Sequence, residues 1–203
     1  MKRGLYLVTP DQNDTGHLLA LTEAALRGGA VCVQYRHKTA SESLRQEQAK
    51  ALRALTREHD VALIINDDAA LARSVEADGV HLGRDDGDIA ALRAVLGEHF
   101  LIGASCYNDF ERARRAAQAG ASYVAFGAMF PSLTKPEAVA APLELIGRAR
   151  SELSVPVACI GGITVDNAPV LAAAGADWLA VITDIYAARD PQAQAARFAA
   201  LYS

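Results

Sequence analysis

A group of polar side chains follows a short apolar run at residues 31–35. Gln34, Arg36 and Lys38 alternate with Tyr35 and His37, and in an extended segment every second side chain points the same way. The spacing therefore predicts an amide and two cations on one side. Arginine can bind a phosphate through two parallel hydrogen bonds and lysine adds a compact charge. This segment is a candidate diphosphate-binding site, with Gln34 left for a polar heterocycle; the alternative is a charged strand end that only keeps the rim of the fold solvated.

Two acidic clusters follow two later apolar runs, at residues 62–65 and 79–82. Their carboxylates are those of Asp67, Asp68, Asp85 and Asp86. Mg²⁺ takes oxygen ligands, often one or two carboxylates with substrate phosphate and water completing the shell. The clusters therefore suggest a magnesium ion that bridges these acids to the bound diphosphate. The alternative is that the aspartates cap the helices that follow, and both roles can coexist.

A loop after the apolar run 123–127 carries further groups suited to phosphate. Ser132 and Thr134 offer hydroxyls and Lys135 offers an ammonium, although an ordinary solvated loop is an equally good interpretation of these residues alone. The paired glycines at 161–162 let the backbone approach a phosphate closely. They indicate a small phosphorylated ligand without specifying one reaction.

These polar groups recur because one unit of sequence recurs: a short apolar run, a polar or glycine-rich break, then an amphipathic segment. The runs expected to be strands are 5–8, 31–35, 62–65, 79–82, 101–105, 123–127, 156–160 and 178–183. The segments expected to be helices are 17–27, 43–57, 69–74, 89–96, 110–119, 143–151, 168–174 and 192–201. Helix caps are expected at Ser41 or Ser43, Asp88, Asp109 and Asp166.

Strict alternation of strands and helices predicts parallel strands covered on both faces. Eight units of about 25 residues each predict one small α/β domain over residues 1–203, a (β/α)₈ TIM barrel. Functional groups gather at the carboxyl ends of the strands in that fold, where the polar groups described above occur. An open doubly wound sheet is the alternative, but the first turn, TPDQNDTG, lacks the glycine fingerprint usual there.

Composition narrows the class of protein. The chain has 203 residues and a net charge of −4, with basic residues scattered along it, so nucleic acid is not an expected partner. No apolar run is long enough for a signal peptide or a membrane span.

The three cysteines, Cys32, Cys106 and Cys159, are widely spaced and set among apolar or small residues, as expected of reduced packing residues in a cytoplasmic protein. His81, inside an expected strand, is interpreted as a hydrogen-bonded core residue. A homo-oligomer is compatible with this composition.

Taken in order, the motifs QYRHK, IINDD, GVHLGRDDG, GAS, YVAFGAMFPSLTKP, ACIGGITVDN and AVIT resemble those of thiamine-phosphate synthase, also called thiamine-phosphate pyrophosphorylase. The resemblance covers nearly the whole chain. It implies a TIM-barrel transferase of thiamine biosynthesis that uses Mg²⁺. Its two small-molecule substrates would be 4-amino-2-methyl-5-(diphosphooxymethyl)pyrimidine and 4-methyl-5-(2-phosphooxyethyl)thiazole, the latter also in a carboxylated form. Diphosphate leaves the pyrimidine, and the thiazole nitrogen attacks the resulting cation to give thiamine phosphate.

The resemblance also implies roles for particular residues. It assigns to the pyrimidine diphosphate Gln34, Tyr35, Arg36, His37, Lys38, Asn66, Ser105 and Lys135, of which Arg36, Lys38 and Lys135 would be catalytic. It assigns to the thiazole phosphate Ser132, Leu133, Thr134, Gly162, Ile182 and Thr183. It assigns Asp67 and Asp86 to magnesium.

This sequence departs from the common pattern of the family at Asp68, Arg84, Tyr107 and Ser132. Arg84 stands beside Asp85 and Asp86, so an ion pair with one of them is a further expectation. Two other functions remain as alternatives. A thiazole tautomerase of the same superfamily would not need the diphosphate-binding cations and metal acids, and a non-catalytic sensor would need only the barrel and its phosphate loops.

Overall fold

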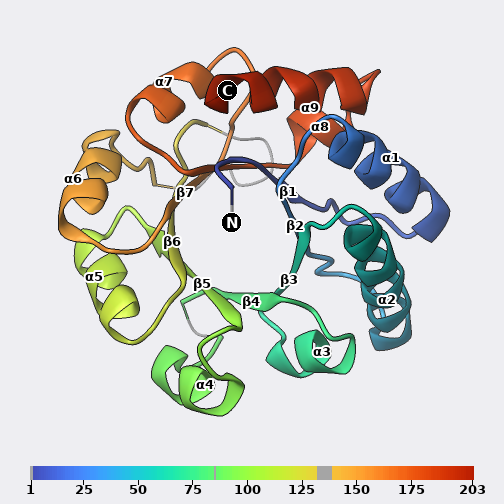
Figure 1. The fold of residues 1–203 in the computed structure, drawn as a ribbon, viewed down its shortest axis with the longest axis horizontal. Helices are drawn as coiled ribbons and strands as arrows, with labels where there is room; N and C mark the ends of the chain where they lie inside the picture. Colours follow the sequence, from blue (N-terminus) through green and yellow to red (C-terminus); the bar gives the residue numbers. More distant parts are fainter. Residues whose placement is uncertain (1, 85, 132–138) are drawn as a thin grey trace. The chain divides into compact units, whose positions relative to one another are not determined.

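The structure is a computed structural model that describes residues 2–84, 86–131 and 139–203. Its strands form a closed barrel in the order β1-β2-β3-β4-β5-β6-β7-β8 (Figure 1), which confirms the predicted (β/α)₈ fold. The strands are β1 Gly4–Val8, β2 Cys32–Tyr35, β3 Ala62–Asn66, β4 Gly79–Leu82, β5 Leu101–Tyr107, β6 Tyr123–Phe126, β7 Val157–Ile160 and β8 Trp178–Val181.

A helix follows each strand. The helices are α1 Thr15–Arg27, α2 Glu42–Glu58, α3 Ala69–Ser74, α4 Ile89–Leu96, α5 Phe110–Gln118, α6 Glu144–Glu152, α7 Ala168–Ala173, α8 Thr183–Tyr186 and α9 Pro191–Ala199, with a short 3₁₀ turn at Ala200–Tyr202. Asp side chains cap several of them as predicted, among them Asp88 at α4 and Asp109 at α5. The cap expected at Asp166 is wrong, because Asn167 occupies that position and its side chain binds the preceding turn instead.

The last strand is shorter than the sequence predicted. β8 ends at Val181, and Thr183 begins the four-residue helix α8. This helical turn buries Ile185 completely and brings the Tyr186 hydroxyl within 2.9 Å of Thr22 in α1. A helical turn therefore stands where the strand was expected to end, because it makes packing contacts that the apolar pattern does not reveal.

The chain divides into two compact parts. The first runs up to Val80 and resumes at Val181. In it β2 pairs in parallel with both β1 and β3, and α9 lies beside α1 (Figure 1). Gly28 permits this approach, since a Cβ there would overlap the carbonyl oxygen of Gln192. The expectation of a single domain over residues 1–203 stays a prediction.

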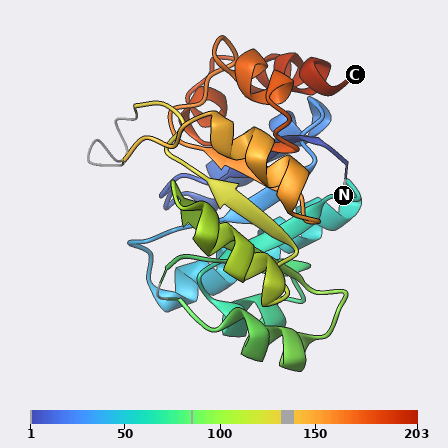
Figure 2. The ribbon, with the colours of Figure 1, turned by 90° about the vertical axis from the view of Figure 1, so that its left-hand side faces the viewer.

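The second part spans His81–Ala180. In it β6 pairs in parallel with β5 and with β7, and α5 and α6 cover the outer side of these strands (Figures 1 and 2). The cysteines of both parts are free and buried, and burial raises the pKa of Cys106 and of Cys159 to about 12. This confirms their interpretation as packing residues.

One arrangement, which we call a bracket, recurs where β4, β6 and β8 begin. A polar residue just before the strand accepts a backbone N–H near the start of the preceding strand and also binds an arginine of the helix that leads into that preceding strand. The three brackets are Asp78 with Leu63 N and Arg53, Ser122 with Ile102 N and Arg93, and Asp177 with Val157 N and Arg150. In such barrels the functional groups lie at the carboxyl ends of the strands. The brackets lie at the opposite, amino ends, so we assign them to stability.

Candidate active site

The segment after β2 has the alternation that the sequence predicted. Lys38 is exposed and the Arg36 side chain is 17% accessible, whereas Tyr35 and His37 are buried on the other side. Gln34 is also buried, and its Nε2 donates to the Tyr6 hydroxyl at 2.8 Å. Because that bond uses the amide nitrogen, the carbonyl oxygen of Gln34 can accept from a heterocycle donor.

Buried partners hold Tyr35 and His37. The Tyr35 hydroxyl donates to Oε1 of Gln48 at 3.0 Å, and burial raises the pKa of Tyr35 to about 12. The Ala40 N–H donates to Nδ1 of His37, so Nε2 bears the ring proton and donates to Asn13 at 3.1 Å. Any contact that Tyr35 or His37 makes with a ligand on the Lys38 side therefore falls to their backbone atoms.

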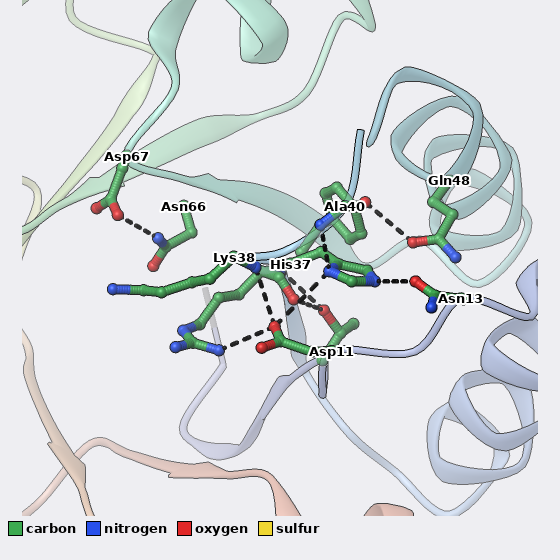
Figure 3. Close-up of polar contacts among 11 residues, drawn as sticks. Asp11, Asn13, His37, Lys38, Ala40, Gln48, Asn66 and Asp67 are labelled. Carbon is green, nitrogen blue, oxygen red and sulfur yellow. Dashed lines mark hydrogen bonds and ion pairs between the residues drawn. The ribbon is translucent and has the colours of Figure 1, made fainter. Parts of the chain in front are cut away.

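The loop after β1 contacts the segment that carries the two cations. Oδ1 of Asp11 accepts from the Lys38 backbone N–H at 3.0 Å and from Nη1 of Arg36 at 3.3 Å (Figure 3). The Lys38 side chain extends toward the side on which Asn66 and Asp67 lie (Figure 3). Among the described residues, the Lys38 ammonium makes no ion pair, so its charge is available to an anionic ligand.

At the end of β3, Asn66 and Asp67 form a second polar pair. Asn66 Nδ2 donates to Oδ2 of Asp67 at 2.6 Å, and Asp67 has a left-handed backbone with φ of 62°. Asp68 behaves differently, because it caps α3 through the Leu71 N–H and lies 3.6 Å from Arg45. The capping alternative is therefore confirmed for Asp68.

After β4, in the second part, Oδ2 of Asp86 accepts from the Gly83 N–H at 2.9 Å. The expected pairing of Arg84 with Asp86 is absent among the described residues. The guanidinium instead lies over the Tyr107 ring, 4.9 Å from its centre, a favourable cation–π contact. Asp85 lies outside the described residues.

Ser105 in β5 is held by a buried histidine. Nε2 of His81 lies 2.8 Å from the Ser105 hydroxyl and Nδ1 lies 2.9 Å from the Tyr123 hydroxyl. Burial lowers the pKa of His81 to about 4, although Asp86 acts in the opposite direction. His81 is therefore a neutral, hydrogen-bonded core residue at neutral pH, as predicted.

Arg112 of α5 connects the ends of β5 and β4. It donates to the carbonyl oxygens of Ser105 and Gly83 at 2.7 and 3.1 Å.

The glycines after β7 also have a packing role, which the sequence did not reveal. A Cβ at Gly162 would overlap the carbonyl oxygen of Pro131, and its φ of 61° is left-handed. Asn167 fixes the same turn by donating to the Gly162 carbonyl at 2.9 Å. Ile182 and Thr183 stand at the start of α8. The predicted loop residues Ser132, Leu133, Thr134 and Lys135 lie outside the described residues.

Comparisons with known proteins agree with this geometry. A model of the thiamine monophosphate synthase family matches residues 5–185. The thiamine-phosphate synthase of Azoarcus sp. (strain BH72) is 59% identical over 99% of this chain and 98% of its own, and that of Aromatoleum aromaticum is 54% identical over 98% and 96%. The chain belongs to the thiamine-phosphate synthase family. A solved thiamine phosphate pyrophosphorylase from Pyrococcus furiosus superposes with a TM-score of 0.87 at 33% identity, covering 98% of this chain and 95% of that one.

Family membership makes this chain a transferase that condenses a pyrimidine diphosphate with a thiazole phosphate to give thiamine phosphate. No helix in the described ranges is long and apolar enough to cross a membrane. The contacts of Thr9 and Asp11 with the cation-bearing segment were not predicted from the sequence. Both residues stand directly after the first strand in TPDQND, at a strand end where functional groups are expected in this fold.

Proposed function

We propose that this synthase works mainly by stabilising the departing diphosphate, and that Arg36 and Lys38 supply the first positive charges for it. The observation that supports this is the alternation after β2: the two cationic side chains lie on the accessible side, whereas Tyr35 and His37 are buried on the other. Arg36 uses Nη1 on Asp11, so Nε and Nη2 form the remaining edge of its planar fork toward phosphate oxygens.

The chemistry needs few protein groups. When the methylene carbon–oxygen bond breaks, its electron pair goes to the diphosphate oxygen and leaves a pyrimidine cation, which the thiazole nitrogen attacks through its lone pair. Cations placed where negative charge grows lower the barrier, and holding two substrates in line removes much of its entropic part. Gln34, Asn66 and Ser105 would orient the pyrimidine diphosphate, and Lys135 would be a third catalytic cation.

We assign Mg²⁺ to Asp67 and Asp86. Each carboxylate has one oxygen in a short-range hydrogen bond, to Asn66 or to the Gly83 N–H, and a carboxylate has further lone pairs for a cation. The described residues contain no cluster of three or more His, Cys, Asp or Glu side chains suited to a metal. Mg²⁺ often needs only one or two protein carboxylates, because phosphate and water complete its shell. When bound, the ion would neutralise diphosphate charge.

For the thiazole phosphate, in its plain or carboxylated form, we propose Gly162, Ile182 and Thr183 together with Ser132, Leu133 and Thr134. The left-handed turn at Gly162, held by Asn167, supports a backbone contact with phosphate. We place the reaction in the cytoplasm, since the three buried cysteines are free thiols suited to a reducing compartment.

Release of diphosphate tests this proposal. The purified protein should release one diphosphate for each thiamine phosphate formed, and only when Mg²⁺ and both substrates are present. Isomerisation of the thiazole phosphate without diphosphate release would identify a tautomerase. Binding of a phosphorylated ligand without turnover would identify a sensor.

A further inference from the structure

A carboxylate lies against the segment that we assign to diphosphate binding. Asp11 comes from the loop between β1 and α1, and a single oxygen, Oδ1, contacts both the Lys38 backbone N–H and the Arg36 guanidinium. Like charges repel each other, so an anion beside a site for diphosphate weakens binding unless it contributes something else. Asp11 must therefore have a compensating role or be a liability.

Neighbouring residues of the same loop contact the same segment at a spacing of two. The fully buried Thr9 hydroxyl accepts the Arg36 N–H at 2.8 Å and donates to the Arg36 carbonyl at 2.9 Å. Asn13 accepts from His37 at 3.1 Å. Residues 9, 11 and 13 thus bind the backbone or side chains of residues 36, 38 and 37.

A buried glutamine fixes this loop to α2. Nε2 of Gln48 donates to the Gln12 carbonyl at 2.8 Å, while its Oε1 accepts the Tyr35 hydroxyl at 3.0 Å. Gln48 itself is fully buried. The loop and the cation-bearing segment are therefore anchored on one helix, and Asp11 sits on a fixed support.

We propose that Asp11 is a positioning residue that preorganises Arg36 and Lys38 for the diphosphate. The inference rests on the proposed function, in which these two cations bind the leaving group. Arginine and lysine side chains lose much rotamer freedom when they are immobilised. Fixing their backbone and one guanidinium nitrogen beforehand reduces the cost that the substrate would otherwise bear. It is the acceptor oxygen of Asp11, and not its charge, that performs this role.

Three variants separate this role from a structural one. Asp11→Ala removes the acceptor, Asp11→Asn keeps a carbonyl oxygen but no charge, and Asp14→Ala is the control. Asp14 is a carboxylate of the same loop that also accepts a backbone N–H, from His17 at the start of α1. The measurements are KM for each substrate, the Kd of inorganic diphosphate with Mg²⁺ by calorimetry, and hydrogen exchange of the Lys38 amide.

Asp11→Ala should raise both the KM for the pyrimidine diphosphate and the Kd of diphosphate about tenfold or more, since the two hydrogen bonds that fix the Arg36 guanidinium and the Lys38 backbone are lost. The KM for the thiazole phosphate should not change, and the Lys38 amide should exchange faster. Asp11→Asn should stay within about threefold of the unchanged protein, because the acceptor remains. Asp14→Ala should lower the melting temperature and leave both KM values unchanged.

Equal rises of both KM values in Asp11→Ala, or an Asp11→Asn variant as impaired as Asp11→Ala, would overturn the inference. If Asp11→Ala does not fold, Asp11→Ser replaces it, because its hydroxyl is too short to contact both partners. Arg36→Ala and Lys38→Ala test the proposed function separately from the role of Asp11. If they bind diphosphate normally, the proposed function is wrong; if they bind it weakly and Asp11→Ala binds it normally, only the role of Asp11 is wrong.

Discussion

Asp67 combines two features that rarely occur without a reason. It is a non-glycine residue in the left-handed region, and its carboxylate is held by the amide of the residue before it. Such backbone strain tends to occur at functional sites. The neighbouring Asp68 has an ordinary capping role instead, so the two adjacent acids have separable functions, and Asp67 is the one to test as a metal ligand.

Asp67→Asn should lower turnover at limiting Mg²⁺ by about 10² or more, because several kcal/mol of charge stabilisation by the ion would be lost. Added Mg²⁺ should restore part of the rate. The fold should survive, because asparagine keeps the size of the side chain, and circular dichroism checks this. Near-normal turnover of the variant at limiting Mg²⁺ would show that the metal assignment is wrong.

His81 makes stability depend on pH. Its folded-state pKa is about 4 because it is buried, while an unfolded histidine titrates near 6.5. Between these values the unfolded chain binds a proton that the folded chain does not, so the free energy of unfolding falls as pH drops from about 6.5 to about 4. Over this range the titration of His81 lowers the free energy of unfolding by about 3 kcal/mol. Above pH 7 His81 adds no further pH dependence.

Urea denaturation at pH 7 and at pH 4.5 measures this effect. The unchanged protein should lose more unfolding free energy between the two conditions than His81→Gln, which lacks the titrating group. Identical losses in the two proteins would contradict the neutral assignment of His81.

At the scale of elements, the brackets before β4, β6 and β8 are a repeat that the sequence displays. The segments ADGVHL, ASYVAF and ADWLAV share an alanine, then a short polar residue, then an apolar strand. The strands were predicted from the sequence but the bracket was not, because its partners lie 15 to 25 residues from Asp78, 20 to 29 residues from Ser122 and 20 to 27 residues from Asp177. The local periodicity of the sequence predicts strands and helices, but it does not predict the side-chain contacts between them.

Asp177→Ala should lower the free energy of unfolding by about 2–3 kcal/mol, since it leaves the buried Val157 N–H without its charged acceptor and Arg150 without its partner. Asp88→Ala, which removes an exposed helix cap, should lower it by only about 1 kcal/mol. Chemical denaturation of both variants gives the comparison. Equal losses would mean that the bracket contributes no more than a surface cap.

At the scale of the whole chain, strand and helix alternation was sufficient to predict the barrel. The expected strands β3 and β4 match the observed ones to within a residue at either end, because apolar runs covered on both faces leave a clear pattern. The period of two also predicted which side chains after β2 share a side. Two features were not predicted because they depend on contacts between residues distant in sequence. One is helix α8, which buries Ile185, and the other is the contact of Asp11 with Lys38.

In the proposed mechanism, the cations after β2 stabilise the departing diphosphate. The most direct measurement is kcat/KM for the pyrimidine diphosphate in Lys38→Ala, with Lys50→Ala on the exposed side of α2 as the matched control. We expect kcat/KM to fall by about 10²–10³ in Lys38→Ala, comparable to the loss of one preorganised charge-stabilising group, and to stay unchanged in Lys50→Ala. A Lys38→Ala enzyme within about threefold of the unchanged protein, on the same scale, would contradict it.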